Sequence, residues 1–259
     1  MSTRRFSLVK WYLDCVTECG DTAIVYCARL NWRGPAVAIA SVLTTHGSEV
    51  ETRSSISGFR LTCNGGEIVA EHSRLQIAGN WRSEAVPVER VPYETSSGFV
   101  HWNCVQPRSL VTLRVAGREM TGLGYAECLT LTLPPWRLPL RRLRWGRFVS
   151  ATDCLVWIDW EGEHSTRIAI LNGLESKVDS VSDTEIALGQ GSLRMEDSVT
   201  LRRGELGATI LPGAPALSKI FPRSLFSVKE QKWRSRGTLS GPDSSSTGWV
   251  IHEVVDWKP

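Results

Sequence analysis

Several familiar signatures are missing from this 259-residue sequence. The longest apolar run, Ala36 to Leu43, is far too short to cross a bilayer. The N-terminal segment Met1 to Lys10 contains Arg4 and Arg5 but no apolar core behind them, so we expect no secretory signal. The seven cysteines include no CxxC pair, and most lie in strand-like runs where a reduced thiol behaves as a small hydrophobe. We therefore expect a soluble, cytoplasmic protein with unpaired thiols.

Common catalytic and cofactor motifs are missing as well. The five histidines show neither HxH nor HExxH spacing, so a metal site is not expected. There is no GxSxG motif, and no cysteine stands in a recognisable Cys–His context. Gly122 and Gly124 form a pair too short for a phosphate or dinucleotide fingerprint, and we expect them to permit a bend at the start of a strand.

The composition is that of an ordinary globular protein with an excess of tryptophan. The net charge of +3 is too small to indicate a nucleic-acid partner. Eleven tryptophans suit a large barrel interior or a pocket for a flat apolar ligand.

Short strand-like segments follow one another along the chain. Examples are Lys10–Val16, Thr22–Trp32 and Ala36–Thr45, separated by turns rich in glycine and asparagine. No long amphipathic helix interrupts them. This pattern predicts an all-β sandwich or barrel. We place a domain boundary near residues 116 and 117, which gives domains of 6–116 and 117–259.

The segment from Gly122 to Trp160 contains the most informative residue. Between Tyr125 and Leu133 the side chains alternate, and Glu127 falls on the same face as the tyrosine and three leucines. Glu253 lies in the same way on the final alternating strand. A buried carboxylate is normally paired, neutralised or used in chemistry. Both glutamates are therefore candidate proton donors in an apolar pocket, with pairing to an arginine of the 137–147 segment as the alternative.

Other polar residues in tryptophan-rich strands are weaker candidates. Asp14 and Asp159 could act as further acids or bases, or could simply pair with a neighbour. His101 and His252 lie next to Trp102 and Glu253, so either could relay a proton or have a structural role.

The 137–147 segment contains five arginines among leucines and tryptophans. Arg144 with Trp145 could stack on a base, and the segment could rest peripherally on an anionic membrane. Prolines at 134, 135 and 139 argue against a recognition helix. We favour a solvated loop that braces a barrel through ion pairs.

Five short motifs occur in an order that resembles a known group of proteins. They are KWYLD (10–14), GLGYAE (122–127), RWGRF (144–148), VWIDW (156–160) and GWVIHEVV (248–255). In this order they resemble the carotenoid 1,2-hydratase (hydroxyneurosporene synthase)-like superfamily. Its wider lipocalin-like group also includes tocopherol cyclases and Diels–Alder cyclases. The resemblance implies two lipocalin-like, calycin-like antiparallel β-barrels that bind an apolar small molecule. It also implies alkene protonation or cyclisation without a metal or organic cofactor.

The resemblance and the residues together give a specific functional hypothesis. Glu127 would be the proton donor to a polyene, terpenoid or polyketide-like molecule in a barrel pocket, with Glu253 or Asp14 as a second acid or base. Tyr125, Trp102 and Trp157 would line the pocket and stabilise positive charge. His101 and Arg144 are further candidate ligand contacts. Two alternatives remain open, namely a non-catalytic carrier of a hydrophobic ligand and a scaffold protein that uses the basic loop 137–147.

Overall fold

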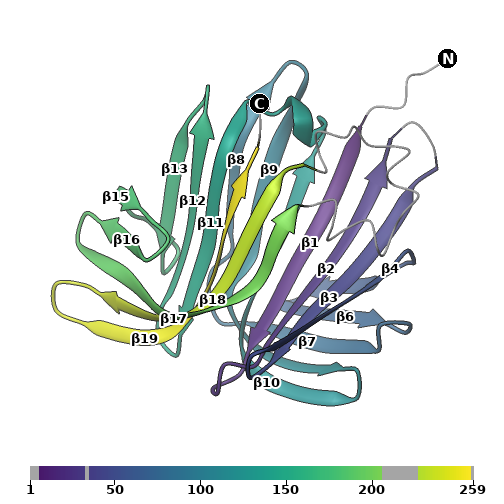
Figure 1. Ribbon diagram of the computed structural model, residues 1–259, viewed down its shortest axis with the longest axis horizontal. Helices are drawn as coiled ribbons and strands as arrows, with labels where there is room; N and C mark the ends of the chain where they lie inside the picture. The colour runs from purple at the N-terminus through teal and green to yellow at the C-terminus, as the bar shows by residue number, and fades with distance from the viewer. Residues whose placement is uncertain (1–5, 33–34, 206–226, 258–259) are drawn as a thin grey trace. The chain divides into compact units, whose positions relative to one another are not determined.

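The computed structural model describes residues 6–32, 35–205 and 227–257, and they form an all-β structure (Figure 1). Apart from one turn of 3-10 helix, η1 (Pro135–Arg137), the regular structure in these ranges is antiparallel strand. None of the described helical structure is long and apolar enough to span a bilayer. The expected fold class is confirmed.

The chain divides into two compact units at the bond between Leu138 and Pro139. This differs from the sequence-based boundary between residues 116 and 117. The reason is strand β10 (Arg118–Leu131), which pairs on one side with β1 (Ser7–Val16) and on the other with β9 (Gly98–Val115). A strand hydrogen-bonded to two strands of the first unit belongs to that unit, whatever turn precedes it.

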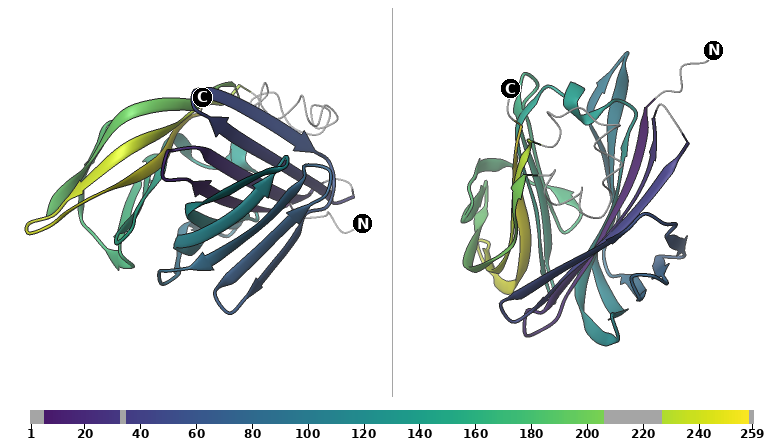
Figure 2. Two further views of the ribbon diagram at one scale, coloured as in Figure 1. Left: turned by 90° about the horizontal axis from the view of Figure 1, so that it is seen from below. Right: turned by 45° about the vertical axis from the view of Figure 1, so that its right-hand side comes forward.

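Unit 1 is one curled antiparallel sheet in the order β4-β3-β2-β1-β10-β9-β7-β6-β5, with β8 also paired to β9 (Figure 2). Its remaining strands are β2 (Thr22–Asn31), β3 (Val37–His46), β4 (Glu49–Ser55), β5 (Arg60–Asn64), β6 (Glu67–His72), β7 (Ile77–Ser83) and β8 (Val88–Thr95). The first strand thus lies beside the last, and the path runs outward through hairpins in both directions. This is the plan of an up-and-down calycin barrel.

One face of the unit 1 sheet is packed with apolar side chains. Leu13 of β1 lies between Val25 of β2 and Ala126 of β10, and all three belong to the buried core. Trp81 of β7 fills part of the same core, and its indole Nε1 donates to the backbone oxygen of Asp14 at 2.7 Å. Period-two alternation therefore sends the neighbouring residues of β1 and β10 to the opposite face.

Unit 2 repeats this plan, in the order β14-β13-β12-β11-β19-β18-β17-β16-β15. Its strands are β11 (Leu140–Ser150), β12 (Cys154–Gly162), β13 (Thr166–Leu171), β14 (Leu174–Glu175), β15 (Val178–Val181), β16 (Glu185–Leu188), β17 (Gly191–Glu205), β18 (Lys229–Ser240) and β19 (Ser245–Asp256). Again the first strand, β11, pairs with the last, β19.

The core of unit 2 follows from the same alternation. Phe148 of β11 lies between Leu155 of β12 and Val250 of β19, all buried. Two residues along each strand, Gly146 lies opposite Trp157, whose ring covers the space above the glycine. Because the buried Trp157 ring occupies the space that a Cβ would need, only glycine fits at position 146.

Candidate functional site

The structure brings three of the predicted site residues together in unit 1. Glu127 is 7% exposed, and its Oε2 accepts a hydrogen bond from Trp102 Nε1 at 2.6 Å and another from the Tyr125 hydroxyl at 2.7 Å. Tyr125 and Trp102 are buried as well. The expected alternative partner, an arginine of the 137–147 segment, is not one of these two donors. A carboxylate, an indole and a phenol thus form a buried polar network in an aromatic setting.

Strand register explains which side chains share this network. Tyr12 pairs with Glu127, and Asp14 pairs with Tyr125, so the four side chains lie on one face of β1 and β10. The apolar core lies on the other face, where Ala126 points. Glu127 therefore lies on the face opposite the core cluster that contains Ala126 and Leu13. Both faces of β10 are buried here, so alternation alone could not tell which one was the interior.

Burial and the side chains around Tyr125 keep its phenol protonated. Desolvation, followed by the effects of Cys104 and Glu127, raises the pKa of Tyr125 well above its usual value. The neutral phenol is therefore a stable hydrogen-bond donor to Glu127 across the range in which proteins are folded. Tyr12 packs edge-on against both Tyr125 and Tyr26, with ring centroids 5.9 and 5.3 Å apart. The carboxyl group is thus surrounded by aromatic rings.

Asp14 and His101 take different places around this network. Asp14 is fully buried and shares the face of Glu127, as its pairing with Tyr125 requires. His101 precedes Trp102 on β9 and so points to the opposite side of the strand, where it bonds to Glu89. The side chain of His101 is partly exposed. Asp14 remains a candidate for the second acid or base, whereas His101 does not join the Glu127 network.

Glu253 lies in unit 2 and has a partner of its own. It forms a close ion pair with Lys232, directly opposite on β18. The Lys232 ammonium is 3.9 Å from Glu230 and lies over the Trp145 ring, 5.5 Å from its centroid. An adjacent ammonium stabilises the ionised carboxylate. The expected role of Glu253 as a proton donor is therefore not favoured, and a role as base or electrostatic partner fits better.

Trp157 and Arg144 are engaged in structural contacts. Trp157 belongs to the buried core of unit 2. Arg144 pairs with Glu161 at 2.9 Å and Asp183 at 3.3 Å. Because Arg144 and Trp145 are neighbours on a strand, their side chains point to opposite faces and do not form a joint stacking platform.

The basic segment is largely a strand, not the loop that we expected. Most of it is β11, and its arginines brace unit 2 through hydrogen bonds and ion pairs. Arg141 pairs with Glu161 at 3.1 Å, and Arg142 pairs with Asp256 at 2.6 Å. Arg147 is buried and donates to the backbone oxygen of Trp249 at 2.8 Å. The favoured bracing role is supported, and nothing in the described residues supports contact with a membrane.

A second buried polar network lies in unit 2, around His252. Its Nε2 is 3.1 Å from Ser235 Oγ, which is 2.8 Å from Ser198 Oγ. Trp233 stacks on the imidazole with a centroid distance of 4.9 Å. Burial lowers the pKa of His252 to about 4. Of the smaller effects, the charge of Asp183 raises this pKa and the charge of Lys232 lowers it. The imidazole is therefore neutral at physiological pH.

This shift predicts a loss of stability in mild acid. The pKa of His252 is about 6.5 in the unfolded chain and about 4 in the folded protein. Between these two pH values the imidazole is protonated in the unfolded chain but not in the folded protein, so acid favours unfolding. Lowering the pH from about 7.5 to about 4.5 should reduce the free energy of unfolding of the wild type by roughly 2–3 kcal/mol more than that of His252→Gln. Urea unfolding at both pH values measures this difference. His164→Gln, at an exposed histidine of the same unit, should keep the wild-type pH dependence.

Sequence reasoning missed two members of these networks. Cys104 interacts with Tyr125, and Lys232 holds Glu253 and Glu230. A signal for Lys232 existed, because Glu230, Lys232 and Arg234 alternate along β18 as charged residues of one face. Within the described ranges, no three His, Cys, Asp or Glu side chains gather as a metal site would require. None of the seven cysteines forms a disulfide bond.

Comparisons with known proteins come from structure alone, since no protein-family model and no curated protein matches the sequence. A protein provisionally named AttH from Nitrosomonas europaea superposes with a TM-score of 0.62 and 9% identity, covering 98% of this chain and 93% of that one. Kievitone hydratase from Nectria haematococca superposes with a TM-score of 0.57 and 10% identity, covering 96% of this chain and 88% of the hydratase. CghA in complex with Sch210972 superposes with a TM-score of 0.59 and 10% identity, covering 98% of this chain and 89% of CghA. The chain therefore shares the fold of these proteins over nearly its whole length, as the sequence resemblance implied.

Proposed function

We propose that this chain, which shares its fold with a hydratase and with CghA, is a cofactor-independent enzyme that protonates a hydrophobic small molecule. Its substrate would be a polyene, terpenoid or polyketide-like compound, and its products would arise by hydration or cyclisation. The observation that carries the proposal is the buried Glu127 carboxyl, held by Tyr125 and Trp102 in an aromatic environment.

The hydrogen bonds to Glu127 suit a proton donor. Both donors converge on Oε2, so in this mechanism the transferable proton is carried by Oε1. The π electrons of an alkene take that proton and leave a carbocation and a Glu127 carboxylate. Trp102 and Tyr125 then stabilise the new negative charge on Oε2, which is a gain realised only as the proton leaves. Electron-rich rings such as Tyr12 stabilise the cation.

The cation can be consumed in two ways. In a hydration, a water lone pair attacks the cationic carbon, and the released proton goes to a base. In a cyclisation, a second double bond of the substrate attacks, and loss of a proton from carbon restores neutrality. Asp14, buried on the face of Glu127, is the base that we propose, and return of its proton to Glu127 completes the cycle.

The test is Glu127→Gln, which keeps the shape of the side chain but cannot donate the acid proton. Purified protein is incubated with the lipid extract of its native host, and mass spectrometry follows molecules that gain one water or change to an isomer. Turnover should fall by about 100-fold or more, while ligand affinity stays close to that of the wild type. Glu119→Gln, at an exposed glutamate of the same strand, should keep full activity.

Two results would overturn this proposal. If the wild type binds hydrophobic molecules from the extract but changes none of them, the protein is a carrier. If Glu127→Gln turns substrate over as fast as the wild type, the acid lies elsewhere.

A further inference from the structure

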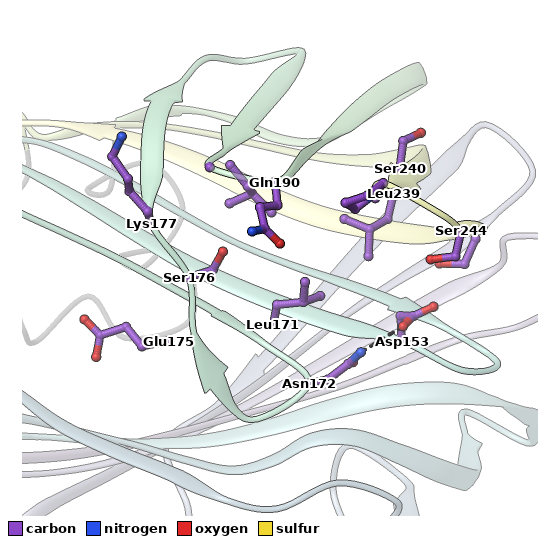
Figure 3. A pocket seen from close by; sticks show the side chains of 15 residues that line it. Asp153, Leu171, Asn172, Glu175, Ser176, Lys177, Gln190, Leu239, Ser240 and Ser244 are labelled. Carbon is purple, nitrogen blue, oxygen red and sulfur yellow. Dashed lines mark hydrogen bonds between the residues drawn. The ribbon is translucent and has the colours of Figure 1, made fainter.

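A cavity of about 600 Å³ lies in unit 2, lined only by residues of that unit (Figure 3). The walls are Asp153 of the β11–β12 turn, residues 171, 172 and 175–177, residues 188–190 of the β16–β17 turn, and residues 239–242, 244 and 246 of the β18–β19 hairpin. Small-molecule pockets typically enclose about 300–1,000 Å³. The cavity is therefore large enough for a ligand, and the Glu127 network has no part in it.

The floor of this cavity is apolar. Leu188 and Leu239 are buried members of the unit 2 core, and Leu171 packs against the same core. A ligand that covers these three leucines would remove apolar surface from water at about 25 cal/mol per Å². The floor thus favours a molecule with a hydrophobic body.

The walls add neutral hydrogen-bonding groups. Ser246 pairs with Leu239 across the β18–β19 hairpin and lies in the lining. Its Oγ is buried and has no hydrogen-bond partner among the described residues. Gln190 and Ser244 also line the cavity, as Figure 3 shows. A buried hydroxyl without a partner is unfavourable, so a ligand hydroxyl or carbonyl at this place would satisfy it.

Hydrogen bonds hold the walls in place before any ligand arrives. Asn172 accepts from the Cys154 backbone at 2.8 Å and donates to Asp153 at 2.8 Å, which ties two turns together. Gly189 donates to the Lys177 backbone oxygen at 2.9 Å, and Gly241 donates to that of Ser244 at 2.8 Å. A preformed cavity loses little entropy on binding.

The charges in the lining restrict the ligand further. Asp153 and Glu175 are acidic, whereas Lys177 is the one basic side chain among the described residues of the lining, and its Nζ pairs with Asp179 at 2.8 Å. An anionic ligand would meet more negative than positive charge here. The cavity is suited to an uncharged molecule.

We propose that this cavity is a second ligand site, for an uncharged amphipathic molecule. The apolar body lies on Leu171, Leu188 and Leu239, and a hydroxyl or carbonyl group bonds to Ser246. This site operates whether or not Glu127 is catalytic, because its residues contribute nothing to the Glu127 network.

Two fluorescent probes with the same aromatic body test the site on the full chain. N-phenyl-1-naphthylamine is uncharged, and 1-anilinonaphthalene-8-sulfonate carries a sulfonate. The uncharged probe should bind saturably, and the sulfonate should bind at least about tenfold more weakly. Ser246→Trp fills the cavity and should weaken binding of the uncharged probe by about tenfold or more. Ser245→Trp, at the adjacent exposed residue outside the lining, should bind it like the wild type.

A second plugging variant guards against misfolding of the first. Gln190→Trp adds the same bulk from an exposed turn position in the lining, where the fold tolerates substitution. Both plugging variants should lose the uncharged probe while keeping the circular dichroism spectrum of the wild type. Equal binding by the wild type and a folded plugging variant, or preference for the sulfonate, would overturn the proposal.

Discussion

Replacing Lys232 by alanine is expected to destabilise the protein by about 3–5 kcal/mol, because a buried charge pair loses one partner and leaves the other uncompensated. Lys232 is 2% exposed and lies beside two carboxylates, those of Glu253 and Glu230. The Lys232→Ala variant also loses the cation–π contact that Lys232 makes with Trp145. Urea unfolding of the full chain, followed by tryptophan fluorescence and circular dichroism, measures the change in free energy.

The control for this prediction is Lys229→Ala, at an exposed lysine of the same strand, which should change the free energy of unfolding by less than about 0.5 kcal/mol. A double variant that combines Lys232→Met with Glu253→Gln should recover part of the loss, since it also removes the carboxylate charge that Lys232 paired with, whereas Glu230 keeps its ion pair with Arg202. A loss below about 1 kcal/mol for Lys232→Ala would show that the surrounding groups compensate for the missing ammonium.

Replacing Gly146 by alanine should destabilise unit 2 by about 3 kcal/mol or more, although it adds a single methyl group. A Cβ at this position would lie 2.6 Å from Trp157 Cη2 and 2.7 Å from Cε2, and closer still to Cζ2. These atoms belong to one rigid ring in the buried core, so the ring cannot move aside without disturbing Phe148 and Leu155.

The matched control is Gly58→Ala, where an added Cβ would meet nothing within 4 Å. That variant should unfold like the wild type, and both are compared by thermal and urea unfolding. If Gly146→Ala is as stable as the wild type, Trp157 has more room than its packing indicates. Combining Gly146→Ala with Trp157→Phe should restore part of the stability, because the smaller ring leaves space for the methyl group.

The sequence was most informative where the signal is local. Alternation between Tyr125 and Leu133 predicted a strand, and β10 contains most of it. The same alternation placed Glu127 with Tyr125, and the two side chains are hydrogen-bonded. The sequence was less informative about the domain boundary, since the turn at 116–117 is a hairpin between two paired strands and not a linker.

The sequence by itself determined that this chain forms antiparallel strands, that Glu127 shares a face with Tyr125, and that most of the cysteines lie in strands without forming disulfide bonds. Each follows from neighbouring residues, because a strand repeats every two residues and needs no distant information. Only the tertiary structure decided which face of β10 became the core, that Trp102 reaches Glu127 from 25 positions away, and that Lys232 neutralises Glu253. These depend on the register between strands far apart in the chain, and register is set by the packing of the whole sheet.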